Sequence, residues 1–97
     1  MRKYKWFENV DGYLIPKKEA GAYKRRRKLA KKKAKAAMET FCDYAYSNYK
    51  GSQDGEAVTG YKDGEAVAFI HLDPEGVERI LAHENQEDLV KMLRDDL

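Results

Sequence analysis

The chain of 97 residues has few of the features that mark secreted, membrane or metal-binding proteins. Its one cysteine, Cys42, excludes an intramolecular disulfide and a cysteine-rich zinc site. The basic N-terminal stretch lacks the apolar run of about 7–15 residues that a signal peptide needs. No segment approaches the roughly 20 apolar residues of a membrane-spanning helix. We therefore expect a cytoplasmic protein that has no membrane partner.

Apolar residues are also scarce. Charged residues make up 37% of the chain and the mean hydropathy is −0.85, so the hydrophobic core must be small. A chain of this length buries roughly 60–70% of the surface that it exposes when unfolded. One tryptophan, seven tyrosines and three phenylalanines supply large side chains for that core. We expect a single domain that spans residues 1–97.

Positive charge is concentrated in one stretch of the chain. Residues 17–35 contain eleven lysines or arginines and a single acidic residue, Glu19. Residues 1–50 hold 15 basic and 5 acidic side chains, a net charge of +10, whereas residues 51–97 hold 4 and 12, a net charge of −8. Such a block of one charge indicates a polyanionic partner for the basic half.

The dipeptide Asp-Gly between β-forming residues predicts two antiparallel hairpins, at residues 1–16 and 56–72. In the second hairpin, a two-residue turn at Asp63-Gly64 predicts that Val58 lies opposite Phe69. That register places Ala57, Tyr61, Ala66, Ala68, Ile70 and Leu72 on one face, where a helix could approach closely. The sequence Asp-Gly-Glu-Ala-Val occurs at residues 54–58 and again at 63–67, which we interpret as shared hairpin chemistry.

Between the hairpins, residues 19–50 show the apolar spacing of one long helix. After Ala36 the apolar arc is broad enough to pack on a sheet. Before Ala36 the arc consists mostly of alanine, and we expect that half of the helix to project from the body of the protein. A competing interpretation ends the helix near Asp43 and makes residues 46–50 a strand.

The C-terminal residues 74–96 predict an acidic helical section. Asp73 suits the N-cap of its first helix and Pro74 the first helical position. The apolar stripe loses its phase around Asn85, which favours two short helices over one. The expected fold is therefore α+β, with a small antiparallel sheet of hairpins packed on one long basic helix and short helices at the C-terminus.

The basic half of the long helix is the candidate functional site. Each i, i+4 pair of like charges costs about 0.2–0.5 kcal/mol in an isolated helix, and cations in the first turns oppose the macrodipole. The total is about 2 kcal/mol, and the phosphates of a nucleic acid would reverse its sign. Arginine can bind phosphate or guanine with two hydrogen bonds, and a tyrosine beside it can stack on a base. The candidate nucleic-acid contacts are Tyr23, Lys24, Arg25, Arg26, Arg27, Lys28, Lys31, Lys32 and Lys35.

Four other interpretations of the charge pattern stay open. The acidic half of the same chain could neutralise the basic run, or another acidic partner could bind it. In a eukaryotic protein, residues 24–35 would also suit a nuclear import signal. The acidic section could instead contact a basic surface on a protein partner, with Tyr46, Glu84, Glu87 and Asp88 as the candidate protein-interface residues.

No catalytic constellation is apparent. The acidic residues near the second hairpin fall at turns and strand starts, without a histidine or lysine at a spacing typical of a metal-dependent nuclease. The chain also lacks a phosphate-binding glycine loop and a zinc motif. Cys42 is best interpreted as a small buried hydrophobe. We expect no enzyme activity, no metal and no cofactor.

The basic block Lys24–Lys35, followed by the Asp-Gly hairpin chemistry, resembles the layout of small phage-encoded inhibitor proteins of the anti-CRISPR kind. The resemblance extends from the N-terminus through the second hairpin and includes no shared motif, so it assigns no functional residue. It implies an inhibitor or modulator that acts in a bacterial host on a nucleoprotein complex, such as an RNA-guided nuclease. The acidic C-terminal half departs from that layout. The alternative is an adaptor or inhibitor that contacts proteins only, through its acidic half.

Overall fold

The computed structural model describes residues 6–10, 12–49 and 56–95, which form two antiparallel sheets and three helices. The elements in chain order are β1 (Phe7–Val10), β2 (Tyr13–Pro16), α1 (Lys17–Phe41), β3 (Tyr44–Tyr49), β4 (Glu56–Lys62), β5 (Glu65–His71), α3 (Pro74–Leu81) and α4 (Gln86–Asp95). β1 and β2 form a two-stranded sheet, and the other strands form a three-stranded sheet in the order β3-β4-β5. The predicted α+β class is confirmed, with the hairpins in separate sheets.

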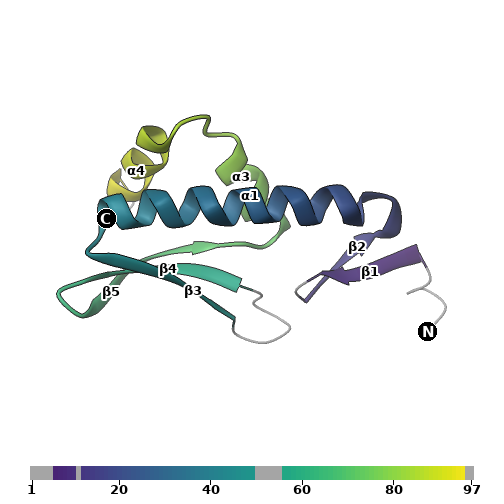
Figure 1. Ribbon diagram of the computed structural model, residues 1–97, viewed down its shortest axis with the longest axis horizontal. Coiled ribbons are helices and arrows are strands. Elements are labelled where there is room, and N and C mark those ends of the chain that lie inside the picture. Colours follow the sequence, from purple (N-terminus) through teal and green to yellow (C-terminus); the bar gives the residue numbers. More distant parts are fainter. Residues whose placement is uncertain (1–5, 11, 50–55, 96–97) are drawn as a thin grey trace.

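Helix α1 is the element on which the others pack (Figure 1). It contacts the first four strands and both C-terminal helices. The β1–β2 hairpin lies near its N-terminal end and the three-stranded sheet runs along its C-terminal part, whereas α3 and α4 pack along another side of α1 and also border β5. The molecule is elongated along α1, with extents of 48 × 27 × 18 Å.

The prediction of a helix over residues 19–50 is wrong at its C-terminal end. Cys42 already has extended backbone angles, and the backbone N–H of Asp43 donates to the carbonyl of Tyr61, 2.9 Å away. From Tyr44 onward the chain pairs with β4, so cross-strand hydrogen bonds replace those of the helix. The competing interpretation of a strand after Asp43 is confirmed, and β3 begins two residues earlier than that interpretation placed it.

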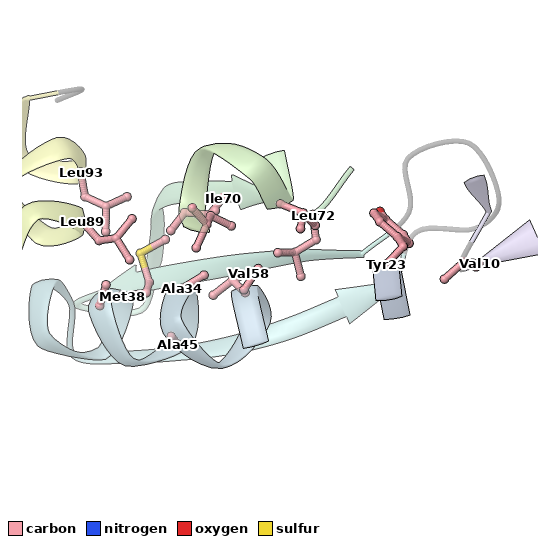
Figure 2. Packing of buried hydrophobic residues seen from close by; sticks show 14 of the residues in the cluster. Val10, Tyr23, Ala34, Met38, Ala45, Val58, Ile70, Leu72, Leu89 and Leu93 are labelled. Carbon is pink, nitrogen blue, oxygen red and sulfur yellow. The ribbon is translucent and has the colours of Figure 1, made fainter. Parts of the chain in front are cut away.

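The expectation that the first half of α1 projects from the body is also wrong. The side chains of Ala20, Ala30, Ala34 and Ala37 are at most 2% exposed, because the β1–β2 hairpin and α3 cover this half. We call these four residues the alanine seam. Figure 2 shows the core as a row along α1, from Met38 beside Leu89 of α4 to Tyr23 near the hairpin.

The β4–β5 hairpin has the predicted turn and a shifted register. Asp63 and Gly64 both adopt positive φ, 54° and 83°, as a type I′ turn requires. A bulge beside Gly60 then inserts one extra residue in β5, so Val58 lies opposite Ile70 rather than Phe69. The predicted face toward the helix is therefore wrong in β4 and at Ala66 of β5. Val58 and Gly60 point to α1, whereas Tyr61 and its partner Ala66 lie on the opposite face of the sheet.

The predicted hairpin at residues 1–16 is confirmed where the structure describes it. Val10 lies opposite Tyr13, and Gly12 has a φ of 96° in the connecting turn. The backbone N–H of Gly12 donates to the side-chain oxygen of Asn9 at 2.9 Å. Residues 1–5 and Asp11 lie outside the described residues, as does the start of the first Asp-Gly-Glu-Ala-Val segment, at residues 54 and 55.

The two C-terminal helices begin as the sequence predicts. The Asp73 carboxylate caps α3 by accepting from the backbone N–H of Gly76 at 2.7 Å, and Pro74 occupies the first turn. Asn85 caps α4 by accepting from the backbone N–H of Asp88 at 3.1 Å. The break predicted at Asn85 is therefore confirmed, and its side chain starts the second helix.

We predict opposite effects on stability for two Gly→Ala substitutions. A Cβ atom at Gly60 would lie 2.6 Å from the buried Cys42 sulfur, so Gly60→Ala overpacks the core and lowers the free energy of unfolding by about 1–3 kcal/mol. Gly21 is the control in α1, because its nearest neighbour would be Arg25 Nη1 at 3.8 Å. Gly21→Ala should raise stability by about 0.5–1 kcal/mol. Urea unfolding measures both changes in the free energy of unfolding. Changes of the same sign in the two variants would contradict the packing described.

Candidate nucleic-acid interface

Exposed cations follow one side of α1 from its first residue almost to its end. At 3.6 residues per turn they fall within an arc of about 120°, opposite the alanine seam. The members of this cationic ridge are Lys17, Lys18, Lys24, Arg25, Lys28, Lys32 and Lys35. The ridge is about 27 Å long at 1.5 Å per residue. Glu39 stands on the same arc one turn further on and ends the run of positive charge.

The helix carries this ridge in spite of its own electrostatics. The ridge places Lys28 four residues from Lys24 and from Lys32, and two cations stand in the first turn, where they oppose the helix dipole. Pro16 at the N-cap supplies no side-chain hydrogen bond. Burial of the alanine seam against the sheets and α3 offsets these costs, since tertiary packing supplies most of the stability of a helix in a protein.

Six of the seven cations of the ridge form no ion pair within the part of the chain that the structure describes. They are Lys17, Lys18, Arg25, Lys28, Lys32 and Lys35. Lys24 differs because its ammonium pairs with the carboxylate of Glu8 in β1. The ridge therefore presents six unpaired cationic groups to solvent at once, spaced along about five turns of helix.

Two of the predicted contacts, Tyr23 and Arg27, are buried, so the structure does not support them as contacts. Their side chains are 9% and 4% exposed, because both stand on the arc of the alanine seam. An Arg27 N–H donates to the carbonyl of Leu72, at the end of β5. Burial raises the pKa of the Tyr23 hydroxyl although the neighbouring Arg27 lowers it, so this hydroxyl stays neutral at physiological pH.

Three further cations of the basic run contact other parts of the same molecule. Arg26 forms an ion pair with Glu78 of α3, and Lys33 donates to the carbonyl of His83 at 2.6 Å. Lys31 is half-buried at the border of the ridge and has contacts of its own. Neutralisation by the chain's own carboxylates is thus seen at Arg26 and Lys24, and it leaves most of the ridge exposed.

The four candidate protein-interface residues are all exposed and do not form one surface. Tyr46 lies on the face of the three-stranded sheet that is turned away from α1 and is 43% exposed. Glu84 precedes α4, and Glu87 and Asp88 lie in its first turn. Glu84 lines a pocket with Lys32 and Lys33 of α1, so it lies beside the helix rather than on the outer face of the sheet that carries Tyr46.

The aromatic surface of the sheet was missed in the sequence. Tyr44, Tyr46 and Phe69 are 51%, 43% and 53% exposed on the face turned away from α1, and the ring of Tyr61 stacks on both tyrosines of β3. We call these four residues the aromatic face. A helical period places Tyr44 in the core and Tyr46 outside it, whereas the strand places both on one face. The alternation of Tyr44, Ala45 and Tyr46 is the signal that favours a strand.

The described residues contain no group of three or more histidine, cysteine, aspartate or glutamate side chains placed to hold a metal ion. Cys42 is buried, and burial raises the pKa of its thiol. The prediction that it serves as a small core residue agrees with that position. Among the helices that the structure describes, none combines the length and the apolar character needed to cross a bilayer.

We predict that neighbouring arginines of the basic run have different effects on folding. Arg27→Ala leaves the buried Leu72 carbonyl without its donor and should lower the free energy of unfolding by about 1–3 kcal/mol. Arg25→Ala, on the exposed ridge, should change it by no more than about 0.5 kcal/mol. Chemical unfolding of the two variants measures the difference. Equal effects would show that Arg27 does not hold β5 to α1.

Comparison of the chain with protein-family models, with curated proteins and with solved structures gave no match, so the interface is assigned from its own residues.

Proposed function

We propose that this protein is a non-enzymatic binding protein whose cationic ridge engages the phosphate backbone of nucleic acid, alone or in the channel of a nucleoprotein complex. The observation that carries the proposal is the row of exposed cations on α1, of which all but Lys24 have no carboxylate partner among the described residues. Phosphates beside these groups would remove the repulsion between like charges and release condensed counterions.

The dimensions of the ridge support a polymeric anion over a small one. A length of about 27 Å corresponds to about eight base pairs of B-DNA, at 3.4 Å per step. The ridge is straight because α1 is one continuous helix from Lys17 to Phe41. A single phosphate compound would contact only a few of its cations, whereas a nucleic-acid backbone could contact most of them.

A role as an inhibitor or modulator agrees with the small size of the protein and its exposed row of cations. The acids Glu84, Glu87 and Asp88 lie at the start of α4 and are not members of the ridge, and Glu84 lines a pocket with Lys32 and Lys33 of α1. A small protein that binds the nucleic acid of a nucleoprotein complex, or the entrance of the groove that holds it, would exclude other ligands. The layout shared with phage-encoded inhibitors supports a target such as an RNA-guided nuclease in a bacterial host.

We predict that removing three ridge cations weakens binding in a salt-dependent manner. The variant Lys28→Gln, Lys32→Gln, Lys35→Gln should lower the slope of log K against log[salt] by about 0.9 for each lost contact with duplex DNA, or about 0.7 with a single strand. Glutamine keeps the helix propensity, so the fold should be retained. Fluorescence anisotropy with labelled RNA and DNA of about 20 nucleotides, across a salt series, gives the slopes.

The matched control removes three exposed cations elsewhere. Lys62→Gln, Lys91→Gln, Arg94→Gln has the same net charge as the ridge variant and alters only residues outside α1. Equal losses in the two variants would mean that net charge, rather than the ridge, determines binding. If the unaltered protein binds neither RNA nor DNA at low salt and instead captures one protein partner, the alternative of a protein-only adaptor is correct.

A further inference from the structure

The three-stranded sheet exposes aromatic rings on the face that its helix does not cover. α1 packs on the side of Ala45 and Val58, which are 7% and 0% exposed. On the other side, Tyr46 of β3, Thr59 of β4 and Phe69 of β5 stand in one row across the sheet. The two rings of this row are about half exposed, whereas Thr59 between them is 1% exposed. The rings thus cover the centre of the sheet and remain open to solvent.

The tyrosine rings of this face are held in a stack. Tyr61 lies 4.8 Å from Tyr44 with an angle of 6° between the ring planes, and 5.7 Å from Tyr46 with an angle of 19°. Three nearly parallel rings from two adjacent strands are therefore oriented before any ligand binds. A planar group that continued this stack would not need to order the rings first, which lowers the entropic cost of binding.

The chemistry of the aromatic face is neutral. Alternation along the strands places no carboxylate among its described side chains. A hydrogen bond with Tyr46 raises the pKa of Tyr61, so this hydroxyl remains protonated at physiological pH. Two exposed acids, Asp43 and Asp63, lie at the β4–β5 turn, where the Asp43 carboxylate accepts from the backbone N–H of Asp63. The described side chains of the face itself therefore offer no carboxylate that would repel a phosphate.

The exposed area of the aromatic face favours nucleobases over a protein surface as its ligand. Three aromatic side chains that are about half exposed offer about 300 Å², if a fully buried ring contributes 150–250 Å². A stable protein interface buries about 800 Å² on each partner. A nucleobase needs only one ring face, and every base can stack on an aromatic side chain. The area favours a few bases over a second copy of the chain.

The sheet edge connects the aromatic face to the cationic ridge. β3 is an edge strand, and α1 covers β3 and β4 rather than β5. A nucleic-acid backbone that leaves the ridge would therefore pass the β3 edge before it reached Tyr44 and Tyr46. Duplex DNA, with a persistence length of about 150 base pairs, does not bend around one strand of a sheet, whereas a single strand does.

We propose that the aromatic face stacks the unpaired bases of a single-stranded nucleic acid whose backbone lies on the cationic ridge. This inference rests on the proposed function, because the ridge supplies the charge that the neutral face lacks. It assigns the single strand as the preferred substrate and Tyr44, Tyr46 and Phe69 as the base contacts. The Thr59 hydroxyl, which has no hydrogen-bond partner among the described residues, lies in the floor between them.

The test compares single-stranded RNA, single-stranded DNA and duplex DNA as probes for one pair of variants. Tyr44→Ala, Tyr46→Ala should weaken binding of either single strand at least tenfold, since each stacked base contributes a factor of about five to 150. Binding of the duplex should change less than twofold. Tyr44→Phe, Tyr46→Phe retains the rings and should restore single-strand binding, which separates stacking from a loss of hydroxyl contacts.

Two controls separate this inference from the proposed function. Trp6→Ala removes an aromatic ring that is 68% exposed and lies outside the aromatic face, and it should leave all affinities unchanged. The tyrosine variants should also keep the salt slope of the unaltered protein, whereas the ridge variant loses slope. Unfolding curves for each variant confirm that the fold is intact, because both tyrosines are about half exposed.

Three results would overturn the inference. If the alanine variant binds single strands normally while the ridge variant does not, the face is not a base platform and the proposed function stands. If the unaltered protein binds no nucleic acid, both proposals fail. If analytical ultracentrifugation finds a dimer that Tyr44→Ala, Tyr46→Ala dissociates, the aromatic face is instead an interface between two copies.

Discussion

Close packing of the alanine seam against its neighbours is the contact on which the rest of the structure depends. Ala30, Ala34 and Ala37 are fully buried on α1, and side chains this small allow strands and helices to approach the helix axis closely. The two sheets do not pair with each other, so α1 is the element that holds both of them. A larger residue in the seam would separate elements that have few other contacts.

Some residues of the basic run take part in this packing, and others lie on the outer surface. Arg27 points inward, where its guanidinium binds the carbonyl that ends β5. Arg26 joins α3 through Glu78, and Lys33 holds the loop before α4 through the His83 carbonyl. The neighbouring Arg25 and Lys28 point outward. Adjacent positions in one charged stretch therefore belong either to the fold or to the surface, according to their angle around the helix axis.

Local signals in the sequence were sufficient for the turns and helix starts. The Asp63-Gly64 turn, the cap at Asp73 and the helix break at Asn85 depend on a few adjacent residues, and the structure confirms them. The end of α1 depends instead on cross-strand pairing with Tyr61, a residue distant in the sequence, so helical periodicity could not locate it.

The errors in the candidate site have the same origin. Tyr23 and Arg27 were assigned to the surface because charge was considered without the burial that α3 and the hairpin impose. An arginine whose hydrogen-bond acceptor is the carbonyl of a distant strand leaves no local pattern. The aromatic face was missed because Tyr44 and Tyr46 share a face only if the backbone is extended. The nine candidate contacts on α1 could be divided into exposed and buried side chains only once the elements that pack on the helix were known.

The junction of β2 and α1 has a mechanical consequence. Pro16 is the last residue of the strand and Lys17 the first of the helix, so no loop separates them. The proline ring restricts φ at this point, which is −53° in the structure. Because no loop intervenes and Glu8 of β1 pairs with Lys24 of α1, the junction and this ion pair together restrict the orientation of the hairpin relative to the helix.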